Sequence, residues 1–185
     1  MKDVVAFVKK YYPKIEETGL TINSTEFSVI SGLKGFNEDG MLESEDEKWL
    51  LDFLFMFIQT PDALNMDFEG LGYEFFVKQV QELSGNEIVF EDAVTKIDPE
   101  VEESGQGTCE ISFKCNGKPY SFTAVFNYDW FDPKFLTFLN SVLEDQKIEK
   151  RLMAFGSWNI CMITLQTPAW MEKFKTLLPM DIEIF

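Results

Sequence analysis

The chain has 185 residues, of which 45% are hydrophobic, and its nineteen phenylalanines and four tryptophans can fill a sizeable core. Thirty-two acidic residues against sixteen basic ones give a net charge of −16, which disfavours binding to nucleic acid or to an anionic membrane because phosphate is repelled. The absence of histidine excludes Ser-His-Asp triads, Cys-His dyads and the usual histidine-containing metal sites.

The N-terminal part, residues 1–84, is predicted to be mainly helical. Apolar residues of the segment DVVAFVKKYY fall on one side of a helix, which Pro13 interrupts or Gly19 ends. Residues 20–34 are rich in β-branched side chains and remain ambiguous between helix and strand. A further helix is expected over residues 73–83, because the Ser-Gly pair that follows is a typical C-terminal signal.

An acidic segment, GFNEDGMLESEDEKWLLD, interrupts this helical part at residues 35–52. Its Asn-Glu-Asp-Gly stretch is typical of a turn. Ser44 and Glu47 form a capping box, which predicts the start of a helix that continues through the apolar run WLLDFLFMFI. That run is too short to span a bilayer. Thr60-Pro61 is a stop signal for the helix and a candidate cap for a short helix after it.

The same segment partly matches an EF-hand calcium loop. With Gly40 at the sixth position of the loop, the first position falls on Gly35, which has no side-chain oxygen. The twelfth position falls on Asp46, which is shorter than the usual bidentate glutamate. Because one ligand is absent and another is shortened, we expect no metal ion and no cofactor. Weak calcium binding at residues 37–46 stays open as an alternative.

The second part, residues 86–185, is predicted to be rich in strands. Strands are expected near 87–97, in a hairpin over 108–128, near 151–165, and at the edge of the sheet in the tail DIEIF. Helices are expected after Asp132-Pro133 and Thr167-Pro168, and the acidic segment 98–107 is expected to be a loop. This order predicts an α+β fold in a single domain of residues 1–185: a mostly antiparallel sheet with helices packed on one face, after a helical N-terminal part.

The hairpin is the best-defined element of the sequence. An Asn-Gly pair between its strands is a strong signal for a two-residue type I′ turn, which pairs Phe113 with Tyr120 and puts the apolar side chains on one face. Cys109 and Cys115 fall on one strand about 20 Å apart, too far for a disulfide. With reduced thiols and no basic-then-apolar leader at the start, we expect a cytoplasmic protein.

Acidic residues gather in two clusters, at residues 38–52 and 87–103, each with seven acids against one lysine. Concentrated like charge steers a basic partner or forms a solvated face, and both interpretations stay open. A third stretch, YDWFD at 128–132, puts aromatic rings between carboxylates, which is typical of a hot spot for lysine or arginine unless the rings fold inward. The candidate partner-binding residues are Glu43, Glu45, Asp46, Glu47, Glu100, Glu102, Glu103, Asp129 and Trp130.

Catalytic chemistry has little support in the sequence. Asp129 and Asp132 are a weak candidate acid–base pair, because Asp132 is needed as a helix cap. The three cysteines are expected in the core, and GLGY at residues 70–73 lacks the spacing of a phosphate-binding loop.

The sequence therefore predicts a non-enzymatic acidic protein that masks a basic protein partner. The most concrete form is an inhibitor or immunity-type protein that neutralises a cationic toxin or nuclease. No nucleic-acid or membrane binding is expected, and the oligomeric state is open. The alternative is a small-molecule-binding domain or a carboxylate-based enzyme with a pocket between the sheet and the helices.

Overall fold

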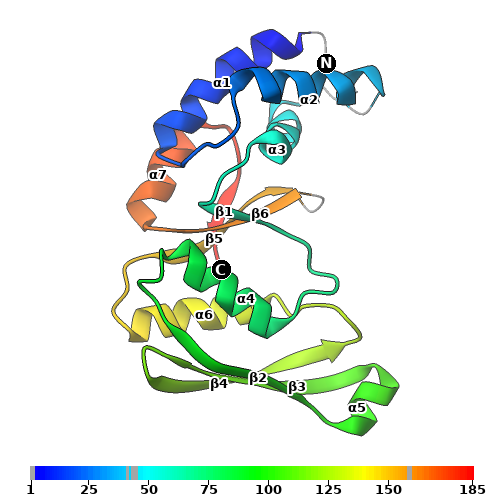
Figure 1. The fold of residues 1–185 in the computed structure, drawn as a ribbon, viewed down its shortest axis with the longest axis vertical. Helices are drawn as coiled ribbons and strands as arrows, with labels where there is room; N and C mark the ends of the chain where they lie inside the picture. The colour runs from blue at the N-terminus through cyan, green and yellow to red at the C-terminus, as the bar shows by residue number, and fades with distance from the viewer. Residues whose placement is uncertain (1–2, 41, 43–45, 158–159) are drawn as a thin grey trace. The chain divides into compact units, whose positions relative to one another are not determined.

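A computed structural model describes residues 3–40, 42, 46–157 and 160–185. The chain forms two compact units, which we call unit 1 (Met1–Asn65 with Met153–Ile184) and unit 2 (Met66–Leu152 with Phe185). Helices and strands combine into an α+β fold, which confirms the predicted fold class (Figure 1). The strands are divided between a four-stranded and a three-stranded sheet, where the sequence pattern indicated one sheet. A single domain over the whole chain stays a prediction.

Unit 1 combines four helices of the described chain with most of the four-stranded sheet. Its helices are α1 (Val4–Thr18), α2 (Glu26–Glu38), α3 (Glu47–Phe57) and α7 (Pro168–Leu177). The sheet has the order β1-β6-β5-β7, formed by β1 (Ala63–Met66), β5 (Arg151–Ser157), β6 (Ile160–Gln166) and β7 (Ile182–Ile184). In the core of the unit, the ring of Phe155 lies 4.9 Å from that of Phe55 and 5.1 Å from that of Phe174, which joins β5 to α3 and α7.

Capping residues decide the helix ends in unit 1. Helix α1 continues through Pro13 and ends where Gly19 adopts a left-handed conformation with a φ of 94°. The ambiguous stretch at 20–34 is helical from Glu26, because Thr25 and Ser28 form a reciprocal capping box. A turn and β1 follow Pro61, where a short helix was a candidate.

The capping box predicted at Ser44 and Glu47 is wrong in its register. Helix α3 begins at Glu47, and Asp46 is its N-cap, accepting the backbone N–H of Lys48 at 2.9 Å. Ser44 itself lies outside the described residues. Because the carboxylate of Asp46 serves the cap directly, Glu47 becomes the first helical residue instead of the third.

The calcium-loop alternative does not fit the path of the backbone. Helix α2 extends to Glu38, so Gly35 and Asn37 are helical where an EF-hand requires loop residues. Residues 41 and 43–45 of the segment lie outside the described part of the chain. Across residues 3–40, 42, 46–157 and 160–185, no group of acidic or cysteine side chains is placed to hold a metal ion.

The predicted strand near 151–165 is two strands, β5 and β6, separated at residues 158–159, which lie outside the described chain. When the residues on both faces of a strand are apolar, the sequence has no alternation of polar and apolar residues to show where the strand ends. Two expectations for the C-terminal region are confirmed. Thr167 caps α7 by accepting the N–H of Trp170 at 3.3 Å, and β7 pairs antiparallel with β5 at the edge of the sheet.

Unit 2 is a three-stranded antiparallel sheet with helices on one face. The helices are α4 (Tyr73–Leu83), the short α5 (Pro99–Ser104) and α6 (Lys134–Asp145). The strands, in the order β2-β3-β4, are β2 (Phe90–Ile97), β3 (Gln106–Cys115) and β4 (Lys118–Asn127). Helices α4 and α6 both cover one face of this sheet (Figure 1). Phe135 of α6 holds this layer together, with its ring 5.0 Å from that of Tyr73 and 5.5 Å from that of Phe122.

The predicted hairpin is confirmed in its register, since Phe113 pairs with Tyr120 across β3 and β4. The loop predicted at 98–107 is wrong, because α5 occupies its centre. Asp98 caps that helix by accepting the N–H of Glu100 at 3.0 Å, and Gly105 ends it in a left-handed conformation. The helix carries three of the candidate acidic residues.

Candidate functional site

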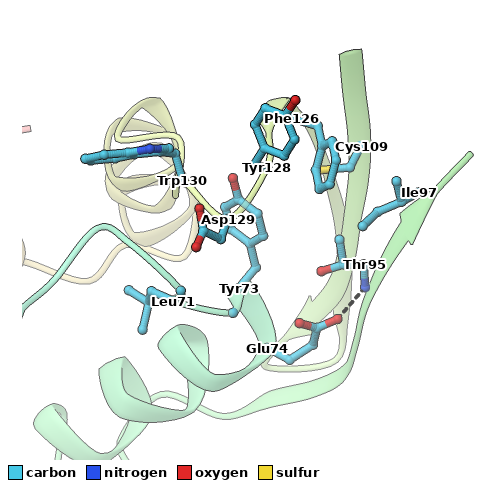
Figure 2. Close-up of a pocket in the computed structure, with 12 residues that line it drawn as sticks. Leu71, Tyr73, Glu74, Thr95, Ile97, Cys109, Phe126, Tyr128, Asp129 and Trp130 are labelled. Carbon is cyan, nitrogen blue, oxygen red and sulfur yellow. Dashed lines mark hydrogen bonds between the residues drawn. The ribbon is translucent and has the colours of Figure 1, made fainter. Parts of the chain in front are cut away.

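A cavity of about 270 Å³ opens in unit 2 beside the first turn of α4 (Figure 2). Three parts of the unit line it: the segment from Gly70 to Glu74, inward-facing residues of β2 and β3, and the stretch from Phe126 to Trp130 that ends β4. The cavity therefore gathers residues that are far apart in the sequence. It also contains two of the predicted partner-binding residues, Asp129 and Trp130.

Aromatic rings and carboxylates make up the mouth of the cavity. The side chains of Tyr128 and Trp130 are 63% and 52% exposed, and Figure 2 shows them on either side of Asp129. Phe131, in contrast, is buried in the core. The neighbouring residues Trp130 and Phe131 therefore point in opposite directions. Glu74 adds a second carboxylate from α4, and none of the lining residues is basic.

Backbone hydrogen bonds hold the aromatic stretch in place. The N–H of Tyr128 donates to the carbonyl of Gly105 at 2.7 Å, and the N–H of Gly70 donates to the carbonyl of Asp129 at 2.8 Å. Tyr128 has a φ of 53°, a left-handed conformation that is uncommon for residues other than glycine. Such a conformation persists only where its surroundings impose it, and it turns Asp129 and Trp130 toward the cavity.

The floor of the cavity is electrically neutral at ordinary pH. Burial raises the pKa of Tyr73 to about 12, and its hydroxyl accepts the N–H of Asp132 at 3.0 Å. Burial, followed by the negative charge of Asp132 and Glu74, raises the pKa of the Cys109 thiol. Because a thiolate is needed for nucleophilic attack, Cys109 is not an activated nucleophile.

Two polar groups of the cavity wall are adjacent. A carboxylate oxygen of Glu74 accepts the backbone N–H of Thr95 at 2.6 Å, the bond drawn as a dashed line in Figure 2. The hydroxyl oxygen of Thr95 is buried and has no hydrogen-bond partner among the described residues. Figure 2 shows that hydroxyl directed toward the cavity, on the side of Tyr73 and Glu74. A buried polar atom without a partner indicates a missing interaction.

The candidate acid–base pair of Asp129 and Asp132 is not formed. Asp132 is only 8% exposed, and its two carboxylate oxygens accept the backbone N–H groups of Val125 and Lys134 at 2.9 and 3.0 Å. Asp132 accepts from the first residue of α6, but the N-cap of that helix is Pro133 and not Asp132, which the sequence had predicted as the cap. Asp132 also does not line the cavity. Only Asp129 of the pair faces the site.

The two described candidates in the acidic cluster of unit 1 are used within the protein. Glu47 accepts hydrogen bonds from Lys10 at 2.5 Å and from the hydroxyl of Tyr11 at 2.7 Å, and these bonds lower the pKa of its carboxyl. Asp46 caps α3. The other two candidates of this cluster, Glu43 and Glu45, lie outside the described residues.

The acidic cluster of unit 2 is used within the protein only in part. Glu87 and Asp92 form ion pairs, and Asp98 caps α5, but the glutamates of α5 point to solvent. The three candidates on α5 are exposed, and no ion pair involves them in the described part of the chain; they are Glu100, Glu102 and Glu103. Both ends of α5 meet the cavity: Ile97, just before the helix, lines it, and Gly105, just after it, contacts the ring of Tyr128. These glutamates therefore lie in the same region of unit 2 as Asp129 and Trp130. We call this region the acidic aromatic site, and it also includes Glu74, Thr95 and Tyr128.

Sequence reasoning missed Glu74 and Thr95, and it considered Tyr128 only as part of the stretch YDWFD. The stretch from Gly70 to Tyr73, just before Glu74, was considered only as a phosphate-binding loop. Its two glycines also indicate a place where the backbone lies close to another segment or to a ligand. Thr95 falls on the buried side of β2, opposite Ile111. A polar residue in a position that faces the helices was the signal available for it.

In comparisons with protein-family models, with curated proteins and with solved structures, nothing matches this chain. In the described chain, no helix combines the length and the apolar character needed to cross a membrane.

Proposed function

We propose that this protein is a non-enzymatic binding protein whose acidic aromatic site takes up a cationic side chain of a basic protein partner. The observation that carries the proposal is a cavity lined by two carboxylates and by the exposed rings of Tyr128 and Trp130, with no basic residue among its walls. Aromatic faces attract cations, and a carboxylate beside them gives a charge partner as water is displaced. The glutamates of α5 add long-range attraction next to the cavity.

The size of the cavity supports a side chain as its occupant. Its volume of about 270 Å³ lies below the range of about 300 to 1,000 Å³ that small-molecule pockets usually have. The neutral thiol of Cys109 and the neutral phenol of Tyr73 lend no support to a catalytic role. Binding of one long side chain at the surface of a larger partner therefore fits better than an enclosed ligand or a reaction.

The most concrete form of this proposal is an inhibitor or immunity-type protein that neutralises a cationic toxin or nuclease. A net charge of −16 supports fast, steered association with such a partner. In this form, the protein suppresses the activity of the basic partner stoichiometrically, and the suppression weakens as salt is added.

Binding of a synthetic peptide of alternating arginine, lysine and glycine residues, measured by calorimetry, tests the proposal. We expect Trp130→Ala and Asp129→Asn each to weaken binding by about tenfold, because each removes a desolvated contact with the cation. The affinity of the unchanged protein is expected to fall between about 20 mM and about 300 mM NaCl, since exposed charges are screened over that range.

Matched variants of unit 2 serve as controls. Phe75→Ala removes an aromatic side chain that is 56% exposed on α4 and does not line the cavity, and Glu110→Gln removes an exposed charge from β3. Both are expected to bind the peptide as the unchanged protein does. Equal losses in Trp130→Ala and Phe75→Ala, or an affinity that ignores salt, contradict the proposal.

A further inference from the structure

The acceptors in the wall of the acidic aromatic site are arranged for a cation with several donors in one plane. We propose that the site selects the guanidinium group of arginine over the ammonium group of lysine and over methylated lysine. This inference rests on the proposed function and specifies which side chain of the basic partner enters the cavity.

Three oxygen acceptors are available around the cavity from three different segments. Glu74 has one carboxylate oxygen bonded to the N–H of Thr95, which leaves its second oxygen for a ligand. Asp129 has a carboxylate for which the described chain provides no hydrogen bond or ion pair. The buried hydroxyl of Thr95 is without a partner among the described residues. A ligand that satisfies all three needs donors pointing in several directions.

Guanidinium meets this requirement better than ammonium does. It carries five N–H donors in a rigid planar fork, whereas the lysine ammonium is a compact group with three donors and a tightly held hydration shell. A quaternary ammonium has no donor, so it leaves the hydroxyl of Thr95 and both carboxylates without hydrogen bonds when it excludes water. The number of acceptors therefore favours arginine over both alternatives.

The aromatic walls favour the same group. The rings of Trp130 and Tyr128 are exposed on either side of Asp129 (Figure 2), so a flat cation that reaches Asp129 passes along an aromatic face. Guanidinium is planar, is weakly hydrated on its faces and stacks on aromatic rings, which an ammonium does less well. Stacking and edge-on hydrogen bonding use different parts of guanidinium, so both are satisfied at once.

Titrations by NMR test the selectivity with blocked amino acids as probes. The probes are N-acetyl-arginine methylamide and its lysine, trimethyllysine and citrulline counterparts, citrulline being the uncharged analogue of arginine. The reporters are the indole N–H of Trp130 and the amide N–H of Thr95, which is bonded to Glu74. We expect the arginine probe to bind at least about fivefold more tightly than the lysine and trimethyllysine probes, and the citrulline probe to show no saturation.

Two variants of Thr95 separate this selectivity from general attraction to positive charge. Thr95→Val removes the hydroxyl and is expected to lower the arginine-to-lysine affinity ratio, whereas Thr95→Ser keeps the hydroxyl and the ratio. Because the hydroxyl makes no hydrogen bond in the described chain, the Thr95→Val substitution removes no hydrogen bond from the folded protein. The amide spectrum of the variant checks that it is folded.

The outcomes distinguish the two proposals. Equal binding of the arginine and lysine probes, or tighter binding of trimethyllysine, overturns the selectivity while the cation-binding function stands. An unchanged ratio in Thr95→Val overturns the part given to the Thr95 hydroxyl. If neither the arginine nor the lysine probe shifts the Trp130 and Thr95 signals, the proposed function is overturned together with the selectivity.

Discussion

At the scale of single residues, Gly105 meets two requirements that no other amino acid satisfies. Its φ of 73° is a left-handed conformation, which glycine adopts without steric cost. A Cβ atom added to it would lie 2.1 Å from the ring of Tyr128, well inside van der Waals contact. Gly105 therefore ends α5 and also provides the surface on which an aromatic wall of the site rests.

We expect Gly105→Ala to lower the free energy of unfolding by about 1 kcal/mol and to weaken binding of the basic peptide as the Tyr128 ring is displaced. Gly85→Ala is the matched control, because Gly85 has a similar φ of 67° and an added Cβ there meets nothing within 4 Å. Denaturation by urea is expected to give similar losses for both variants. Only Gly105→Ala is expected to lose peptide affinity, and equal affinities contradict the role given to Tyr128.

Single residues of the site were predictable only where the local pattern was strong. Trp130 and Asp129 were candidates because the stretch YDWFD mixes rings and acids within five residues. Which ring would turn outward depends on the backbone of Tyr128 and on the packing of Phe131 against α6, and neither is encoded locally. For Thr95 the sequence provided only a polar residue on the buried face of a strand, because its unsatisfied hydroxyl becomes visible only when α4 packs against β2.

At the scale of elements, the register of the hairpin was predictable and α5 was not. The hairpin depends on an Asn-Gly turn and on alternation over ten residues in each strand, and both are local signals. Helix α5 has only six residues, too few for helical periodicity to appear. Its caps were present in the sequence as Asp98-Pro99 and Gly105, but the acidic composition indicated a loop.

Glu47 links two helices of unit 1 instead of completing a capping box, and this contact can be measured. We expect Glu47→Gln to lower the free energy of unfolding by up to about 1 kcal/mol, because it removes an exposed ion pair with Lys10 of α1. Those bonds lower the pKa of Glu47, so their stabilisation is present above the ordinary pKa of glutamate and is lost at lower pH. Urea denaturation is expected to show the difference at pH 7 and a smaller difference at pH 3.

Glu17→Gln is the control for that measurement, since Glu17 is exposed on α1 and forms no ion pair in the described chain. Its stability is expected to match the unchanged protein at both pH values. A Glu47→Gln variant that behaves like Glu17→Gln shows instead that solvent screening removes the whole benefit of the contact.

At the scale of the whole molecule, the fold class was predictable and the division into two sheets was not. Alternating and helical patterns indicate which face of an element is buried, but they contain no information on which strands pair. Helix α6 separates β4 from β5 along the chain, and the two strands join different sheets. The two acidic clusters consequently fall in different units, at residues 38–52 and 87–103.

Both units bury weak acids in their neutral form. Burial raises the pKa of Cys115 in unit 2 and of Cys161 in unit 1 to about 11, from 9.0. It also raises the pKa of Tyr73 to about 12, from 10.0. In the unfolded chain these groups ionise at their ordinary pKa values, while the folded protein keeps them protonated. The stabilisation by the two thiols is therefore complete below about pH 9 and is lost as pH rises through about 11. For Tyr73 it is complete below about pH 10 and is lost as pH rises through about 12.

The free energy of unfolding is accordingly expected to fall between pH 9 and pH 11. The rise of the Cys115 pKa from 9.0 to about 11 corresponds to about 3 kcal/mol, because its side chain is fully buried. Urea denaturation at pH 8, 9.5 and 11 with a reducing agent measures the decline. In Cys115→Ala the decline is expected to be smaller by about that amount, although the variant is less stable at pH 8 because it leaves a small cavity. An equal decline in both proteins contradicts the assignment, because the lost stability then arises from groups other than the Cys115 thiol.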